Sequence, residues 1–336
     1  MQLKQSEQKK KISMGMNKDI KKHKVAIVGA GNMAEEHIKA YNSLNNLYRV
    51  TGIFSRTLKK ASHLQKKYKI ENLCSSINEL QKKSKAEILI ISTNVLSTKK
   101  ILFKALKYNW KILVEKPAGY NLKEAKKIYE TAKKKNKLND IFVGLNRRNF
   151  QSTRKLLSIL KNGKNNRILT VTDYQNINNK LIKKHPILVQ KNWMYANSIH
   201  LVDYFSIFCR GRIISVKKKI KLKSKKLEYV HASLSYSSGD QGVYKGYWMT
   251  DGKWKISLRE KNKIYKFQPL ERLKSKNNSN NFLTVKTDYS LDTKFKPGVL
   301  QQAKEISSML NKNFFNLATL KQSLTTMKLI NKIYKI

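Results

Sequence analysis

The sequence predicts an α/β protein in which a doubly wound parallel sheet is followed by an α+β region with a large, mostly antiparallel sheet. Within residues 24–146, short apolar runs alternate with amphipathic stretches of helical period, as in parallel strands that helices connect and cover on both faces. Within residues 147–336, strand-like stretches follow one another with turn residues between them, which is typical of antiparallel strands. We expect these two ranges to be two domains, preceded by a basic, disordered extension of residues 1–23.

Each element of the first domain follows from its local pattern. Strands are predicted where aliphatic residues run together, at 24–28, 49–54, 87–91, 112–114 and 141–145. Helices are predicted where apolar residues recur every three or four positions, at 33–43, 58–68, 77–83, 98–108 and 122–136. The stretch around Leu73 has no clear period, so we expect an irregular segment there.

The second domain is predicted from alternating stretches and turn residues. Strands are expected at 168–174, 214–222, 229–236, 243–249, 254–258 and 264–267. Helices are expected at 154–160, 197–208, 299–310 and 317–334. The polar stretch 275–281 is predicted to be a surface loop, and the helices are expected to cover one face of the sheet.

The charge of the chain is its most conspicuous property, with 71 Lys and Arg against 21 Asp and Glu and a formal net charge of +50. Electrostatics alone would suit a polyanionic partner. The excess is mainly lysine spread over the whole length, whereas nucleic-acid readers concentrate basic residues, arginine in particular, on one face. Because lysine, asparagine and isoleucine are abundant together, the bias of an AT-rich genome is the favoured explanation, and nucleic acid is a disfavoured partner.

The chain shows no sign of a membrane, secreted or metal-binding protein. No stretch approaches the run of about 18 apolar residues that a membrane span needs, and residues 1–23 lack the apolar core of a signal peptide. Cys74 and Cys209 are too few for a disulfide framework, and the six histidines have no metal-ligand spacing. We expect a cytoplasmic protein without a metal and without a membrane partner.

The clearest motif is the glycine turn after the first predicted strand, in VAIVGAGNMA. Gly29 permits the tight turn, and Gly31 lets the backbone approach a pyrophosphate. Asn32 and Met33 open the next helix, whose N-terminus presents unpaired N–H groups to an anion. Because this turn lies between a first strand and a helix, it predicts a dinucleotide site.

The end of the second strand indicates which dinucleotide binds. NAD sites usually carry an acid there for the ribose hydroxyls, but this chain has Ser55 and Arg56 after Phe54. Ser55 can bond a 2′-phosphate, and Arg56 can pair with it while stacking on the adenine. We therefore expect NADP(H) in preference to NAD(H).

With these motifs placed, the chain resembles the Gfo/Idh/MocA oxidoreductases from residue 24 to its end. The resemblance is carried by GAGNMA (29–34), ISTN (91–94), VEKPAG (114–119), GLNRR (144–148), SIHLVD (198–203) and FKPGVLQQAKEISSML (295–310). It implies a Rossmann domain followed by a sheet-containing domain that forms the substrate cleft and makes homo-oligomers, dimers or tetramers. It also implies that Thr93 and Asn94 border the cofactor, although the family usually has Thr-Pro there.

Glu115 and Lys116 follow the strand 112–114, at the edge where open parallel sheets bind ligands. The resemblance implies that Lys116 is catalytic, reaching the nicotinamide ribose and the reacting oxygen of the substrate, and that Glu115 borders the cofactor. A desolvated lysine beside oxidised nicotinamide has a lowered pKa and can orient or deprotonate an alcohol. Glu115 could hold Lys116 by pairing, unless strand alternation points the two side chains apart.

The second catalytic candidate, His200, departs from the family pattern in its surroundings. That pattern has an aspartate, a glycine and a histidine at two-residue spacing, and this chain has Ala196, Ser198 and His200. The carboxylate that would form an i,i+4 relay with the histidine is therefore absent. His200 would act alone or with a polar neighbour, namely Lys116, Tyr195 or Asn197.

Four residues are candidates for holding the substrate. Arg147 can donate two parallel hydrogen bonds to a carboxylate or phosphate, or else form a salt bridge between the domains. Trp193 and Tyr195 can stack on a sugar ring, or else belong to the core. Asn197, the first residue of the predicted helix 197–208 that carries His200, completes the set.

We expect an NAD(P)-dependent oxidoreductase that transfers a hydride between nicotinamide and a secondary alcohol or ketone of a sugar, nucleotide-sugar or cyclitol. An acidic or nucleotide-linked sugar for surface polysaccharide is the favoured substrate, because the cleft is expected to be basic. Two alternatives stay open. The missing carboxylate favours a catalytically idle regulatory protein that binds a dinucleotide or sugar, and the charge alone favours a nucleic-acid-binding protein.

Overall fold

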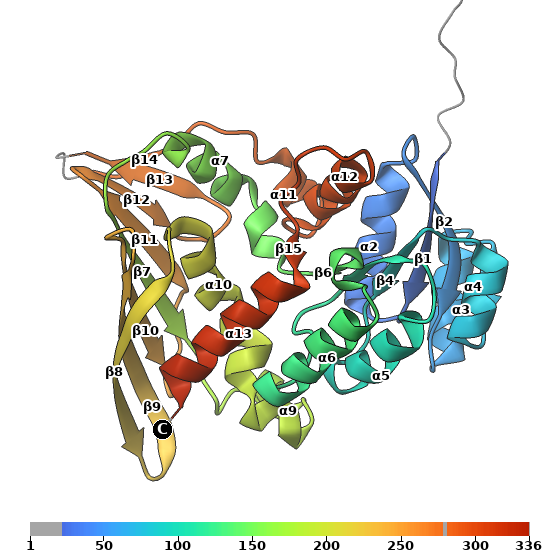
Figure 1. The fold of residues 1–336 in the computed structure, drawn as a ribbon, viewed down its shortest axis with the longest axis horizontal. Helices are drawn as coiled ribbons and strands as arrows, with labels where there is room; N and C mark the ends of the chain where they lie inside the picture. Colours follow the sequence, from blue (N-terminus) through green and yellow to red (C-terminus); the bar gives the residue numbers. More distant parts are fainter. Residues whose placement is uncertain (1–21, 278–280, 336) are drawn as a thin grey trace, which may run out of the picture.

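The structure, a computed structural model, describes residues 22–277 and 281–335. They form two sheets that lie at opposite ends of the molecule with helices between and around them (Figure 1). Most of the predicted extension 1–23 lies outside the described residues, and His23 already belongs to the first strand. Of the predicted loop 275–281, residues 278–280 also lie outside them, while Ser275 and Lys276 belong to a strand.

The first sheet confirms the doubly wound α/β prediction. In spatial order its strands are β15 (Ala318–Thr319), β6 (Ile141–Val143), β5 (Lys111–Val114), β4 (Ile88–Ile91), β1 (His23–Val28), β2 (Tyr48–Phe54) and β3 (Asn72–Cys74). Strands β1 to β6 are parallel, and β15 is antiparallel to β6. Along β1, Ala26 and Val28 pack into one hydrophobic cluster and Val25 and Ile27 into another, so the sheet is buried on both faces.

The helices that connect these strands are α2 (Asn32–Ser43), α3 (Leu58–Lys67), α4 (Ile77–Ser84), α5 (Val95–Ala105) and α6 (Leu122–Lys134). The start of α5 corrects the predicted start at residue 98. Asn94 caps this helix by accepting a hydrogen bond from the Ser97 backbone N at 3.0 Å. The segment around Leu73, predicted to be irregular, is β3. It has only 3 residues and is held by pairing with β2, a tertiary contact that local periodicity does not record.

The second sheet confirms the mostly antiparallel prediction. In spatial order its strands are β14 (Leu283–Thr284), β13 (Leu273–Lys276), β12 (Lys263–Phe267), β11 (Lys255–Glu260), β7 (Arg167–Tyr174), β10 (Gln241–Tyr247), β9 (Lys226–Tyr236) and β8 (Ile213–Lys223). Strands β7 and β10 pair in parallel, and the other neighbours pair antiparallel. We did not predict β13 and β14, which carry lysine, serine and threonine in place of an apolar alternation.

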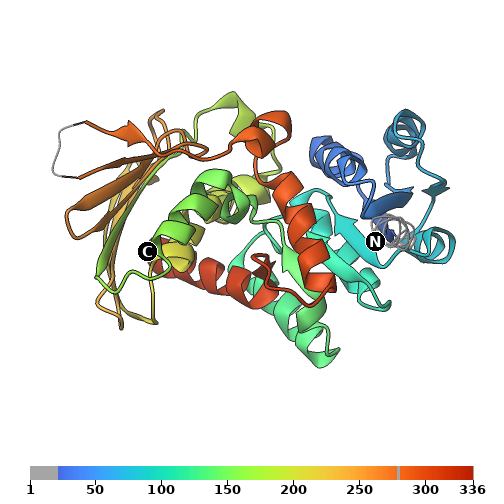
Figure 2. The same cartoon turned by 90° about the horizontal axis from the view of Figure 1, so that it is seen from above.

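Helices cover one face of the second sheet, as predicted. They are α7 (Gln151–Leu160), α10 (Ile199–Phe208) and α13 (Leu320–Tyr334), and they lie between the two sheets (Figures 1 and 2). The chain enters α10 through a π-helical turn, Met194–Ser198. We did not predict the short helices α8 (Lys180–Lys183), α9 (Ile187–Lys191) and α11 (Ser290–Lys294). The outer face of the sheet is covered by no helix of the described residues.

The last part of the chain returns to the first sheet. Helix α12 (Val299–Leu310) packs against α2, and the Tyr48 hydroxyl donates to the Ala303 carbonyl at 2.7 Å. Strand β15 then extends the sheet beyond β6. These contacts join the last part of the chain to its first domain.

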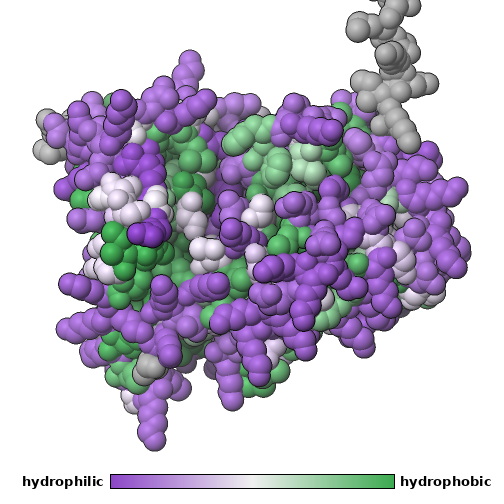
Figure 3. Space-filling model, in the orientation of Figure 1, coloured by the Kyte–Doolittle hydropathy of each residue, from purple (hydrophilic) through white to green (hydrophobic). Residues whose placement is uncertain are grey.

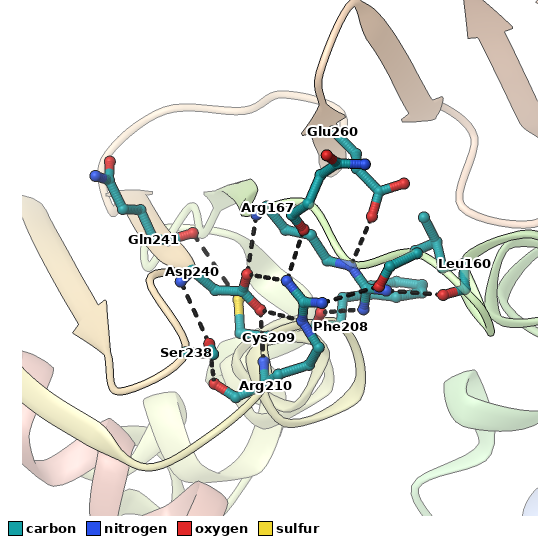
Figure 4. A network of polar contacts seen from close by, with 11 residues as sticks. Leu160, Arg167, Phe208, Cys209, Arg210, Ser238, Asp240, Gln241 and Glu260 are labelled. Atoms are coloured by element: carbon teal, nitrogen blue, oxygen red, sulfur yellow. Dashed lines mark hydrogen bonds and ion pairs between the residues drawn. The ribbon is translucent and has the colours of Figure 1, made fainter.

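A separate polar network joins α7, α10 and the second sheet (Figure 4). Asp240 accepts hydrogen bonds from Arg210, at 2.8 Å from the backbone N and 2.7 Å from Nη2. It also accepts from the Arg167 backbone N at 2.9 Å. The Arg167 guanidinium donates to the carbonyls of Phe208 and Leu160, at 3.1 and 2.9 Å. These bonds satisfy the carbonyls at the C-terminal ends of α7 and α10, and they fix both helices to the sheet.

Hydrophilic side chains cover most of the face in Figure 3, with hydrophobic residues in separate patches. Among the described residues, no helix is both long and apolar enough to cross a membrane. Over the same residues, no group of three or more His, Cys, Asp and Glu side chains could hold a metal ion.

Candidate active site

The glycine turn after β1 leaves an open space at the start of α2. Gly29 has a φ of +122°, and a Cβ there would lie 2.0 Å from the Ser92 carbonyl oxygen, so only glycine fits. At Gly31, the residue that precedes α2, an added Cβ would meet no heavy atom within 4 Å. The backbone N–H groups of the first helical turn therefore face an opening that suits the pyrophosphate of a dinucleotide.

A cavity of about 300 Å³, which we call the dinucleotide cavity, extends from this turn along the carboxyl ends of β1, β2 and β4. The predicted cofactor residues that line it are Gly29, Gly31, Ser55, Arg56, Thr93 and Asn94. Lys60 lines it as well. We did not predict Lys60, although its position four residues after Arg56, in the first turn of α3, was a usable signal. Asn32 is exposed at the start of α2 and does not belong to this lining.

Two further cavities adjoin Lys116. The Trp193 cavity, about 340 Å³, shares Asn94 with the dinucleotide cavity and is also bordered by Trp193, Asn197 and Lys116. The His200 cavity, about 330 Å³, is bordered by Lys116 and by Met33, Glu115, Arg147 and His200. Lys116 thus lies between the two, at the carboxyl end of β5, where a doubly wound sheet binds its ligands.

The Lys116 side chain is held by the second domain. Its Nζ donates a hydrogen bond to the Ala196 carbonyl at 2.9 Å. Desolvation, and then the positive charges of Arg147 and Lys296, lower the pKa of Lys116 to about 8, while Glu115 opposes this effect. Lys116 therefore exchanges its proton close to neutral pH.

Glu115 does not pair with Lys116. Its Oε1 lies 2.8 Å from Nε2 of His37, a buried residue of α2. Strand alternation accounts for this, because consecutive side chains leave β5 in different directions. His37 ends the motif VAIVGAGNMAEEH, yet nothing in the sequence showed that it would hold this carboxylate.

His200 is neutral at physiological pH. Burial, and then the charges of Arg147, Lys116 and Lys296, lower the pKa of His200 well below its ordinary value. Its Nδ1 is buried and has no hydrogen-bond partner among the described residues. A buried, unpartnered ring nitrogen beside a cavity is available to a ligand hydroxyl.

The two adjacent arginines have different surroundings. Arg148 is buried and binds Asp203 of α10 through two hydrogen bonds of 2.7 Å, so it forms a buried salt bridge within the range 147–336. The Arg147 guanidinium lies 5.0 Å from the centre of the Trp254 ring, and its Nε has no partner among the described residues. Desolvation lowers the pKa of Arg147 to about 10. Arg147 is thus a cation that faces the His200 cavity.

Lys296 and Glu271 also border the His200 cavity, and we did not predict either. Lys296 belongs to the segment FKPGVLQQAKEISSML, which the resemblance had singled out without giving a role to this lysine. Lys296, Lys116 and Arg147 place three basic side chains on the lining of one cavity. The acidic side chains on the same lining are Glu271 and Glu115, and Glu115 is bound to His37.

Trp193 and Tyr195, the two residues predicted to stack on a sugar ring, lie in different environments. Trp193 borders its cavity, and its indole Nε1 donates to Gln175 Oε1 at 2.8 Å. Asn197 borders the same cavity and donates to the same oxygen at 3.0 Å. Tyr195 borders none of the three cavities. It packs in the main hydrophobic cluster, and its hydroxyl donates to Asn331 at 3.2 Å.

A doubly wound sheet whose carboxyl edge joins an open dinucleotide cleft to an ionisable lysine defines a class, the Rossmann-fold oxidoreductases. Residues 23–144 match the model of the Gfo/Idh/MocA family, described as an oxidoreductase family with an NAD-binding Rossmann fold. This domain belongs to that family, as the motifs predicted. No match was found among curated proteins.

Solved structures share the fold over nearly the whole chain. An oxidoreductase from Thermotoga maritima is 16% identical with a TM-score of 0.76, over 94% of this chain and 96% of its own. Levoglucosan dehydrogenase in complex with NADH and L-sorbose is 15% identical with a TM-score of 0.76, over 94% and 96%. A UDP-N-acetylglucosamine 3-dehydrogenase from Acidithiobacillus ferrooxidans is 11% identical with a TM-score of 0.72, over 92% and 96%. At these identities the likeness is one of fold.

Proposed function

We propose that the protein is an NADP(H)-preferring dehydrogenase or reductase that acts on a secondary alcohol or ketone of a sugar-type substrate. The observation that carries the proposal is the position of Lys116, between two cavities and beside the dinucleotide cleft, with its pKa lowered to about 8. The family of the first domain binds NAD(P), and the sugar dehydrogenases among the structural neighbours support a sugar-type substrate.

The roles of the side chains follow from their charges. A bound nicotinamide supplies or accepts the hydride. Lys116 Nζ takes up or releases the proton of the substrate hydroxyl, since its pKa lies near neutrality. Neutral His200 forms a hydrogen bond with that hydroxyl through Nδ1. Because Lys116 handles the proton and is held by the backbone carbonyl of Ala196, the chemistry needs no carboxylate at position 196.

The cations of the His200 cavity support an acidic or phosphate-bearing sugar, including a nucleotide-linked one. Arg147 and Lys296 border this cavity with Lys116, and a guanidinium binds carboxylate or phosphate with two parallel hydrogen bonds. A cytoplasmic location and a place in surface-polysaccharide synthesis belong to the same proposal. We also propose a homo-oligomer that buries the outer face of the second sheet, which light scattering after gel filtration would measure.

The proposed activity is tested by turnover. The protein is incubated with NADPH or NADP⁺ and a panel of neutral sugars, cyclitols, sugar acids and nucleotide-sugars, and NADPH absorbance is followed. Turnover that is greatest for a negatively charged sugar supports the proposal. Cofactor binding without turnover of any of these compounds would favour the second candidate, a regulatory dinucleotide-binding protein.

The preference for NADP(H) is supported by three residues of the dinucleotide cavity, Ser55, Arg56 and Lys60. Replacing Arg56 by alanine is expected to weaken NADPH binding by about tenfold, the effect of one charge-assisted pair of 1–3 kcal/mol. NADH binding should change little, because NADH has no 2′-phosphate. Titration with both cofactors, followed by nicotinamide fluorescence, measures the two affinities.

The matched control is Lys59→Ala, which removes a nearby cation from the first turn of α3 but not from the cavity lining. Equal affinity of the wild type for NADPH and NADH, or equal weakening of both by Arg56→Ala, would contradict the preference.

A further inference from the structure

The turn that precedes α10 lines the Trp193 cavity and also accepts the hydrogen bond of Lys116. The Ala196 carbonyl accepts the hydrogen bond of Lys116 Nζ, and Trp193 and Asn197, on either side of Ala196, border the Trp193 cavity. Residues Met194–Ser198 form a π-helical turn, a distortion that recurs at functional sites. A backbone carbonyl has no rotamers of its own, so whatever holds this turn decides where Lys116 is held.

Gln175, the residue after β7, holds the turn on both sides of Ala196. Its Oε1 accepts a hydrogen bond from Trp193 Nε1 at 2.8 Å and another from Asn197 Nδ2 at 3.0 Å. Gln175 is only 2% exposed, so its side of these bonds is shielded from water. An indole nitrogen only donates, which requires the oxygen of the Gln175 amide to face the turn.

Asp173 holds Gln175 in that orientation. Its Oδ1 accepts from Gln175 Nε2 at 2.6 Å, and its Oδ2 accepts from the Tyr244 hydroxyl at 2.6 Å. The Tyr244 oxygen lies 2.5 Å from the hydroxyl of Tyr334, which also accepts from Trp248 Nε1 at 3.1 Å. A chain of buried hydrogen bonds thus runs from β10 and α13 through β7 to the turn.

We propose that Asp173 and Gln175 are positioning residues, which fix the turn 193–197 so that the Ala196 carbonyl meets the Nζ of Lys116. Neither residue borders the three cavities, so both act through the turn and not on a ligand. The kinetic part of the test rests on the proposed function, whereas the chemical part does not.

The effect on Lys116 follows from the groups that face it. Arg147 and Lys296 are cations, His200 is neutral, and Glu115 is bound to His37. The Ala196 carbonyl is an acceptor that favours the protonated amine. If the turn moves, the ammonium loses this acceptor and keeps its cationic neighbours, so the pKa of Lys116 is expected to fall.

The experiment compares the wild type with Gln175→Met, a variant of similar size that neither accepts from Trp193 nor donates to Asp173. Trace labelling with acetic anhydride at a series of pH values, followed by peptide mass spectrometry, measures the reactivity of the neutral Lys116 amine. It gives the titration midpoint of Lys116, the pH at which half of the amine is deprotonated, without any substrate. We expect this midpoint to fall by about half a pH unit or more. We also expect kcat to fall about tenfold or more, with the Kd for NADPH within about twofold of wild type.

Two further variants make the result specific. Gln175→Glu keeps the oxygen that accepts from Trp193 and Asn197. When the new carboxyl shares a proton with Asp173, it also keeps the bond to Asp173. The Lys116 midpoint of this variant should therefore lie closer to that of the wild type than the midpoint of Gln175→Met does. Thr153→Val removes an unrelated buried hydrogen bond, to Tyr204 at 3.2 Å, and should leave the Lys116 midpoint unchanged. If Gln175→Met does not fold, Trp193→Phe removes one of the two donors and should shift the midpoint in the same direction.

A wild-type Lys116 midpoint in Gln175→Met, or in Trp193→Phe where the first does not fold, would overturn the proposal. So would an equal shift in Thr153→Val. A lowered midpoint in a protein that turns over no sugar would support the positioning role and count against the proposed activity instead.

Discussion

Replacing Lys116 by methionine is expected to lower kcat by about 10²- to 10⁴-fold, the contribution of a general acid–base group. The Kd for NADPH should rise much less than kcat falls, because Lys116 is expected to contact only the nicotinamide ribose and the dinucleotide cavity is lined by other residues. Steady-state turnover and a fluorescence titration measure the two quantities. Near-normal kcat in this variant would assign the proton transfer to His200 instead.

The control for Lys116→Met lies on the same strand. Lys111 starts β5 and pairs with Asp140 in a partly exposed salt bridge, so Lys111→Met should leave kcat unchanged. The pH dependence gives a second check on Lys116. Oxidation of the alcohol needs the neutral amine, so its rate should rise as the pH passes about 8, whereas reduction of the ketone needs the ammonium and should slow over the same range.

Replacing Arg148 by methionine is expected to lower the free energy of unfolding by about 3–5 kcal/mol, because it leaves the buried carboxylate of Asp203 without its cation. Asp203 is 2% exposed, and Arg148 gives it two hydrogen bonds of 2.7 Å. Urea denaturation measures the loss. In the double variant with Asp203→Leu, the loss should be smaller than the sum of the two single losses.

Arg147 provides the matched comparison, since it is the adjacent residue and the same kind of side chain. Arg147→Met should cost little stability, because it removes a desolvated cation whose Nε has no hydrogen-bond partner within residues 22–277 and 281–335. It should instead raise KM for an acidic or phosphate-bearing sugar by about tenfold or more. Equal stability losses in the two variants would show that both arginines are structural.

Much of the fold was predictable because it rests on local pattern. The aliphatic run of β4 and the glycine turn at Gly29 and Gly31 signal their roles through neighbours in sequence. Strand β3 was missed because it has only 3 residues and is stabilised by tertiary contacts, namely pairing with β2 and packing against α3 and α4. Strand β15 was missed for the same reason, as its partner β6 lies far away in the sequence.

In the candidate site, too, features that depend on local sequence could be predicted, and features that depend on distant contacts could not. Lys116 and His200 stand in motifs, and so do Ser55 and Arg56 at the end of β2, so their positions could be predicted. The residues that contact them or share their cavity come from distant segments: the Ala196 carbonyl for Lys116, His37 for Glu115, and Lys296 for the charge of the His200 cavity. No spacing rule shows which of two adjacent arginines meets Asp203, because the answer depends on how α10 packs.

The return of the chain to its first sheet has a consequence for biosynthesis. A ribosome releases β1 to β6 long before α12 and β15, yet β15 pairs with the edge of β6 and α12 packs on α2. The bond from Tyr48 to Ala303 spans 255 positions, and contacts of such separation form slowly, because a long loop must close first. The Rossmann domain therefore reaches its final packing only after residues 299–319 have left the ribosome, and until then its exposed strand edge is open to mispairing with other nascent chains.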